Sequence, residues 1–416
     1  MLKRLFGALV AAAALCPAAH AAPADKLRAD LADLVARHQI PCAEVMIARH
    51  GRLLTHIRLG EADIDAHTLL PADAIFRFYS MSKPITSVAI LMLAEEGRLR
   101  LDDPVARWLP AFGQMRVYAG GGADDMRTVP ANRPITIEDL LLHRGGLTYP
   151  FMGAGPVQRY YRSHGVQRDT PVGRQPGDAP PAQDLAQLVE RLGAAPLLHQ
   201  PGEKWDYSYS TTVLGAVVEK ASGQSLDAFL RQRIFAPLEM KDTGFVITPA
   251  QLPRFVALTT ATAQGLATSE TAAASEYRDP ARLRDGGGAL AGTTRDYLHF
   301  AEMLANGGSW HGRRLLNARS VAAMFTPRLP TGGSGLEDTR FGYGLAIGDA
   351  HTAAIGGLPV GAGSWSGSGN SYFFADRRRG LAVVFMTSEL TPGPFAARET
   401  ATRQLVDRGV ESLLAP

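Results

Sequence analysis

Apolar and polar positions follow a regular pattern near the N-terminal end of the chain. Leucine and valine recur at helical spacing over residues 25–39, which predicts an amphipathic helix. Two β-rich runs, Ala43–Arg49 and Leu53–Leu59, follow this helix. The triplet His50-Gly51-Arg52 between them is a plausible hairpin turn.

The C-terminal end mirrors this pattern. Asn370–Ala375 and Leu381–Thr387 are predicted strands around the charged turn Asp376–Gly380, and a last helix is expected over roughly residues 395–414. Strands at both ends, separated by mostly helical sequence, indicate one antiparallel sheet assembled from both termini. The expected fold class is therefore α+β, with helices flanking the sheet.

The middle of the chain combines one buried helix with a long irregular stretch. Residues 85–96 are apolar almost all round, which predicts a buried helix that begins near Pro84 and stops at Gly97. Residues 150–182 are rich in Pro and Gly, and we expect a structured loop or lid there.

The first residues have the features of an export signal. Lys3 and Arg4 precede the apolar run Leu5–Leu15, and small residues follow, so residues 1–21 are interpreted as a cleaved secretory signal peptide. The run is too short for a stable membrane anchor. A lipoprotein anchored through Cys16 is disfavoured, because Leu15 is bulky for the position before such a cysteine. The protein is expected to be exported, either periplasmic or secreted.

Charge and cysteine content exclude several classes of protein. The formal net charge is +3, and losing residues 1–21 with their two basic residues leaves +1, so no nucleic-acid surface is expected. Only Cys42 remains after residue 21, so no internal disulfide can form. Hydrophobic residues make up 46% of the chain, which suffices for a large core. The oligomeric state is left open.

Three local patterns carry candidate chemistry. Ser80 and Lys83 are three residues apart at the start of the buried helix, so their side chains share a face, and burial favours a neutral amine that accepts the serine proton. Tyr207 precedes an apolar helix that Gly223 ends, and a phenol near a cation can act as a base once its pKa is lowered. The run 363–370 is rich in glycine, which lets a backbone approach a ligand. Each pattern alone also has a purely structural explanation: a helix cap, a packed aromatic and a bulged edge strand.

Taken together, these patterns resemble the serine β-lactamases and penicillin-binding proteins, and most closely the class C β-lactamases and family VIII carboxylesterases. The resemblance covers nearly the whole chain after the signal peptide. It implies a β-lactamase/transpeptidase-like fold in residues 22–416, with a sheet lobe at about 22–78 and 330–416 and an all-helical lobe at about 79–329. The motifs that carry it are Phe78-Tyr79-Ser80-Met81-Ser82-Lys83-Pro84, Leu101–Val105, Ile137–His143, Gly145-Gly146-Leu147, Pro237–Met240 and Gly286-Gly287-Gly288-Ala289-Leu290.

The resemblance also implies roles for individual residues. Ser80 would be the acylated nucleophile, Lys83 would hold the proton network, and Tyr207 would be its base partner and protonate the leaving group. The backbone N–H groups of Ser80 and Ser368 would form the oxyanion hole. No cofactor or metal is implied, and His143 is expected to be a structural neighbour of the site. The expected pocket residues are Tyr149, Phe151, Tyr209, Trp365, Ser366 and Gly367.

Two departures from the class C pattern bear on the substrate. Tyr209 stands where an Asn is typical, and Trp365-Ser366-Gly367 replaces a Lys-Thr-Gly triplet. The lost ammonium would cost a β-lactam carboxylate a charge-assisted contact of about 1.5–3 kcal/mol. We therefore expect a carboxylesterase, compatible with weak β-lactamase activity. A class C-like β-lactamase, a D-amino-acid peptidase acting on amides, and a non-catalytic cell-wall-binding homologue remain alternatives.

Overall fold

The computed structural model describes residues 21–168, 175–329, 340–391 and 397–415. The expected signal peptide, with Cys16, therefore lies almost entirely outside the described residues. No helix among those described combines the length and apolar content needed to cross a bilayer.

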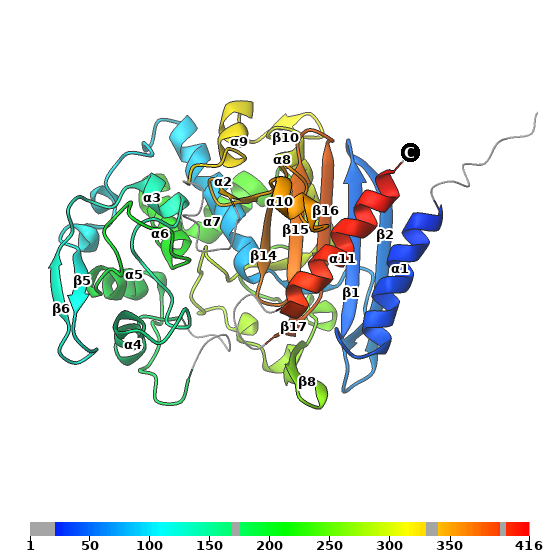
Figure 1. The fold of residues 1–416 in the computed structure, drawn as a ribbon, viewed down its shortest axis with the longest axis horizontal. Coiled ribbons are helices and arrows are strands. Elements are labelled where there is room, and N and C mark those ends of the chain that lie inside the picture. The colour runs from blue at the N-terminus through cyan, green and yellow to red at the C-terminus, as the bar shows by residue number, and fades with distance from the viewer. Residues whose placement is uncertain (1–20, 169–174, 330–339, 392–396, 416) are drawn as a thin grey trace, which may run out of the picture.

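One large antiparallel sheet joins the two ends of the chain, as predicted (Figure 1). Its strand order is β12-β13-β14-β15-β16-β1-β2-β3. The junction between the ends is the pair β1 and β16, in which Val45 lies opposite Phe385. The strands are β1 Cys42–Arg49, β2 Arg52–Asp63, β3 Thr68–Leu69, β12 Arg340–Phe341, β13 Ala346–Ile347, β14 Gly363–Gly367, β15 Ser371–Asp376 and β16 Leu381–Met386.

The sheet is covered on both faces. Helices α1 (Ala21–Ala36) and α11 (Ala397–Leu414) lie against one face, and α8 (Thr294–Ala305) packs on the other. Strand β16 is apolar throughout because both of its faces are buried. Its odd-numbered residues join the cluster under α1 and α11, and its even-numbered residues join the main core.

The segment between the sheet strands is mainly helical but not entirely so. Its helices are α2 Ser82–Glu95, α3 Ile137–Leu141, α4 Pro156–Ser163, α5 Leu185–Ala194, α6 Ser210–Ser222, α7 Leu226–Leu230 and α9 Ala318–Met324; the short α10 Ala350–Ala354 follows between sheet strands. Short strands accompany them: β4 Ile75–Arg77, β5 Arg116–Gly120, β6 Arg127–Pro130, β7 Leu258–Thr262, β8 Gly265–Glu270, β9 Ala291–Thr293, β10 Ser309–Trp310, β11 Arg313–Arg314 and, from beyond the segment, β17 Glu389–Leu390. The expectation of an all-helical lobe over about 79–329 therefore needs correction: this segment also forms hairpins and supplies α8 to the sheet. The exact lobe boundaries stay a prediction.

Helix α2 is the central helix of this segment. Residues 82–93 are all buried, because α2 packs between α6 and the sheet side of the core. The predicted helix is thus present, with Pro84 in its first turn as expected, and Ser80 lies in the 3₁₀ turn directly before it. Gly223 ends α6 in the left-handed conformation, at φ 73°, as the sequence indicated.

Candidate active site

Ser80 lies in a short 3₁₀ turn, η2 (Tyr79–Met81), that links β4 to α2. Tyr79, directly before it, has a φ of 45°, a left-handed conformation that costs a non-glycine residue about 1–2 kcal/mol. The ammonium of Lys83 donates a hydrogen bond to Ser80 Oγ at 3.1 Å. The predicted pairing of these side chains on one face is therefore present.

Lys83 is a buried amine with one short backbone partner. Its side chain is 2% exposed, and its Nζ donates to the carbonyl oxygen of Gly287 at 2.5 Å. The same nitrogen lies 4.7 Å from the ring centre of Tyr207 and 5.5 Å from that of Tyr149. Burial lowers the pKa of Lys83 to about 7, so the amine is largely neutral at slightly alkaline pH.

Tyr207 comes from the loop that leads into α6 and also contacts Ser80. Its phenol hydrogen-bonds to the Ser80 side chain, which lowers its pKa, but burial outweighs this effect and raises the pKa well above the ordinary value. The expectation of a lowered phenol pKa is therefore wrong. Tyr207 is a neutral phenol in this site, because the low-dielectric surroundings penalise the phenolate.

Strand β14 places its C-terminal end against η2. A Cβ atom built on Gly367 would lie 2.3 Å from the carbonyl oxygen of Phe78, so only glycine allows this approach. Ser366 and Ser368, on either side of Gly367, are both half-buried. The glycine-rich third pattern therefore lies beside Ser80, where the oxyanion hole was expected.

Several aromatic rings lie close to Lys83 and Tyr207. Tyr149 stacks on Phe151 at 4.7 Å and packs edge-on against Tyr209 at 4.4 Å, between ring centres. Trp365 lies 5.5 Å from Tyr207. Of the predicted pocket residues, Tyr149 and Trp365 lie beside Tyr207, and Phe151 and Tyr209 pack on Tyr149, so these four rings form an aromatic wall. Their contact with substrate stays a prediction.

Three further groups that contact Trp365, Tyr207 or Lys83 were not predicted from the sequence. Phe341 contacts Trp365 at 5.3 Å, and Trp205 stacks on Tyr207 at 6.1 Å. The Gly287 carbonyl that binds Lys83 was also missed, although its motif was noted. His143 was assigned correctly as a neighbour, since its buried ring lies 5.0 Å from Tyr207 and hydrogen-bonds Ser208 at 3.1 Å.

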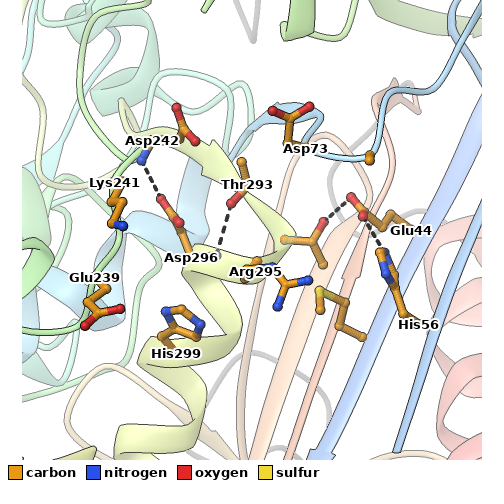
Figure 2. A pocket seen from close by; sticks show the side chains of 13 residues that line it. Glu44, His56, Asp73, Glu239, Lys241, Asp242, Thr293, Arg295, Asp296 and His299 are labelled. Atoms are coloured by element: carbon orange, nitrogen blue, oxygen red, sulfur yellow. Dashed lines mark hydrogen bonds and ion pairs between the residues drawn. The ribbon is translucent and has the colours of Figure 1, made fainter. Parts of the chain in front are cut away.

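Away from Ser80, a hollow of about 240 Å³ lies at the start of α8 beside β1 and β2 (Figure 2). Its buried carboxylates have protein partners: Glu44 bonds His56 at 2.7 Å and Thr294, and Asp296 accepts from the backbone of Asp242 at 2.9 Å. In the main sheet, β1 lies three strands away from β14, the strand that packs against the turn holding Ser80. Among the described residues, no cluster of His, Cys, Asp and Glu has the makings of a metal site.

Known proteins resemble this chain over almost its whole length. The family model described as Beta-lactamase matches residues 27–408. Esterase EstB of Burkholderia gladioli is 32% identical over 389 residues, covering 88% of this chain and 90% of that protein. The structure of EstCE1, a hydrolase with promiscuous acyltransferase activity, superposes with a TM-score of 0.75 at 26% identity, covering 93% of this chain and 99% of EstCE1. A family VIII carboxylesterase shares the fold, with a TM-score of 0.70 at 19% identity over 94% of this chain and 98% of its own. This chain belongs to the β-lactamase family.

Proposed function

We propose that the protein is a serine esterase that cleaves carboxylic esters through an acyl-enzyme on Ser80. The observation that carries this proposal is the meeting of Ser80 with a buried amine, Lys83, whose pKa lies near 7, and with a neutral phenol, Tyr207. The amine can take a proton at near-neutral pH, and the phenol can give one. A nucleophile, a base and an acid are thereby available within one contact network.

In the acylation step, neutral Lys83 accepts the hydroxyl proton of Ser80 as Oγ bonds to the ester carbonyl carbon. The carbonyl oxygen becomes an oxyanion, which the backbone N–H groups of Ser80 and Ser368 stabilise. The bond to the alkoxy oxygen then breaks. Tyr207 donates its proton to the departing alcohol and regains one from Lys83.

Deacylation reverses these roles, with water as the nucleophile. Water adds to the acyl carbon and loses a proton to the same network. The bond to Ser80 Oγ breaks, Oγ takes back a proton, and a carboxylic acid leaves. Division into two steps makes each barrier lower than that of direct hydrolysis.

An ester is favoured over a β-lactam because of Trp365 and Tyr209. An indole at the edge of the site gives a carboxylate no charged partner, whereas it suits an acyl or alcohol chain. The esterase EstB, at 32% identity, supports the same assignment. β-Lactam or D-amino-acid peptide hydrolysis stays the second candidate, because a serine nucleophile with the same base and acid can also attack an amide carbonyl.

An alcohol in place of water would turn the same acyl-enzyme into an acyl-transfer catalyst. The specific observation that favours this side reaction is the aromatic wall, which binds an apolar acceptor better than water. EstCE1, with its promiscuous acyltransferase activity, agrees with it.

We further propose that the protein is exported, on the strength of the charged, apolar and small-residue order in residues 1–21.

Trapping the nucleophile tests the mechanism. The protein would be incubated with a p-nitrophenyl alkylphosphonate, digested and mapped by mass spectrometry. The phosphonyl group is expected on Ser80, and Ser80→Ala should remain unlabelled. Ser82→Ala removes a neighbouring buried serine and should still be labelled at Ser80. Labelling of another residue, or none with active enzyme, would contradict a Ser80 nucleophile.

A further inference from the structure

The carbonyl that holds Lys83 belongs to a turn of glycines that other buried side chains fix. Thr86 Oγ1, on α2, donates to the carbonyl oxygen of Gly286 at 2.8 Å. The next residue, Gly287, presents its carbonyl oxygen to Lys83 Nζ at 2.5 Å. The position of the amine therefore depends on how residues 285–289 are folded.

Asp285 is the residue that folds this turn. Its fully buried carboxylate accepts, through Oδ1, hydrogen bonds from the Gly287 amide and from Thr212 Oγ1, both at 2.6 Å. Its own carbonyl oxygen accepts from the amides of Gly288 at 3.2 Å and Ala289 at 3.0 Å. Both peptide groups that flank the Gly287 α-carbon are thus held by Asp285, one through its side chain and one through its backbone.

The three glycines are explained by the same packing. A Cβ on Gly286 would lie 2.8 Å from Thr86 Oγ1, and one on Gly287 would lie 2.7 Å from Thr212 Oγ1. A Cβ on Gly288 would lie 2.9 Å from a guanidinium nitrogen of Arg168. These contacts leave no room for side chains, so the turn closes tightly over Lys83.

Two opposite charges face the amine across this turn. Arg168 Nη1 lies 3.1 Å from Asp285 Oδ2, and both side chains are buried or nearly so. The negative charge of Asp285 raises the pKa of Lys83 and the positive charge of Arg168 lowers it, both secondary to burial. The other titratable or polar groups around the amine are Ser80, Tyr207, Tyr149 and His143.

We propose that Asp285 is a positioning residue of the esterase reaction, which holds the Gly287 carbonyl against Lys83 and, paired with Arg168, sets the charge around that amine. The proposal rests on the proposed function, and it adds two residues that act on the reaction only through Lys83. Neither the Asp285 carboxylate nor the Arg168 guanidinium needs to touch the substrate for this role.

The test measures kcat/KM for p-nitrophenyl butyrate from pH 5 to 9. In Asp285→Asn the amine loses its anionic neighbour, so the acidic limb should move to lower pH by about one unit or more. In Arg168→Gln the amine loses its cationic neighbour, and the limb should move to higher pH. The double variant lacks both charges, and its limb should lie between those of the single variants.

Controls separate this role from simple support of the fold. Asp407→Asn removes another buried carboxylate, on α11 at the other face of the sheet, and should leave the limb in place. Unmoved limbs in folded Asp285→Asn and Arg168→Gln would overturn the positioning role alone. If Asp285→Asn does not fold, as judged by circular dichroism, the direction of the Arg168→Gln shift decides. A wild-type protein without Ser80-dependent ester hydrolysis would instead overturn the proposed function itself.

Discussion

The side-chain nitrogen of Lys83 is bound by the backbone carbonyl oxygen of Gly287, 2.5 Å away, although 204 residues separate them in the chain. The same nitrogen also contacts the Ser80 hydroxyl and lies near the ring of Tyr207. Lys83 is also buried, at 2% exposed, so its proton affinity is set by the surrounding protein. That consequence underlies the expected pH dependence of the reaction.

Ester hydrolysis should depend on pH through the Lys83 amine. Burial lowers its pKa to about 7, and the neutral form is the base, so kcat/KM should fall about tenfold per pH unit below 7. A pH–rate profile with p-nitrophenyl butyrate measures this. Lys83→Met, of similar length and without charge, should lose about 10²–10⁴-fold at pH 8. An acidic limb below pH 5 would show that a carboxylate is the base instead.

Tyr207→Phe should remove proton donation and the hydrogen bond to Ser80 while it keeps the ring contacts. The phenyl ring keeps the contacts with Trp365 and His143, so the melting temperature should hardly change. We expect kcat to fall by about 10²–10⁴-fold with KM nearly constant, because the hydroxyl acts in the transition state. A variant with wild-type kcat would mean that leaving-group protonation comes from elsewhere.

Trp365→Lys should shift preference towards β-lactams. The new ammonium supplies the charge-assisted contact to a β-lactam carboxylate, so kcat/KM for nitrocefin should rise about tenfold or more over that of Trp365→Met. The Met variant is the matched control, since it loses the same ring contacts with Phe341 and Tyr207 without gaining charge. Equal nitrocefin rates in the two variants would contradict the role given to position 365.

How far the sequence predicts this molecule depends on the range of the contacts. The hairpin at His50-Gly51-Arg52 and the Ser80–Lys83 pair were predictable, because turn chemistry and helical spacing act between near neighbours. The Gly287 carbonyl was not, because its meeting with Lys83 is made only by tertiary packing. The wrong direction for the pKa of Tyr207 has the same origin: a nearby cation was visible in the sequence, but full burial was not.

Stability should also depend on pH, through a buried carboxyl on α11. Asp407 accepts a hydrogen bond from Tyr372 at 2.9 Å, and burial raises its pKa to about 7. A raised carboxyl pKa means that the folded protein binds a proton the unfolded chain has lost. The free energy of unfolding should therefore fall as pH rises from about 4 to 7, by up to about 4 kcal/mol.

Asp407→Asn removes this dependence. Its amide oxygen can still accept from Tyr372, so the variant should melt a few degrees above wild type at pH 8 and close to it at pH 4. Differential scanning calorimetry at both values tests this. A melting difference that is the same at the two pH values would rule out Asp407 as the titrating group.

The most direct measurement is kcat/KM for p-nitrophenyl butyrate and for nitrocefin, made side by side on the protein and on Ser80→Ala. We expect strong ester hydrolysis, little nitrocefin cleavage, and loss of both in the variant. Preference for nitrocefin would contradict the assignment of Trp365 and Tyr209 to an ester site and would make the protein a β-lactamase. Ester hydrolysis that survives in Ser80→Ala would contradict the mechanism as a whole.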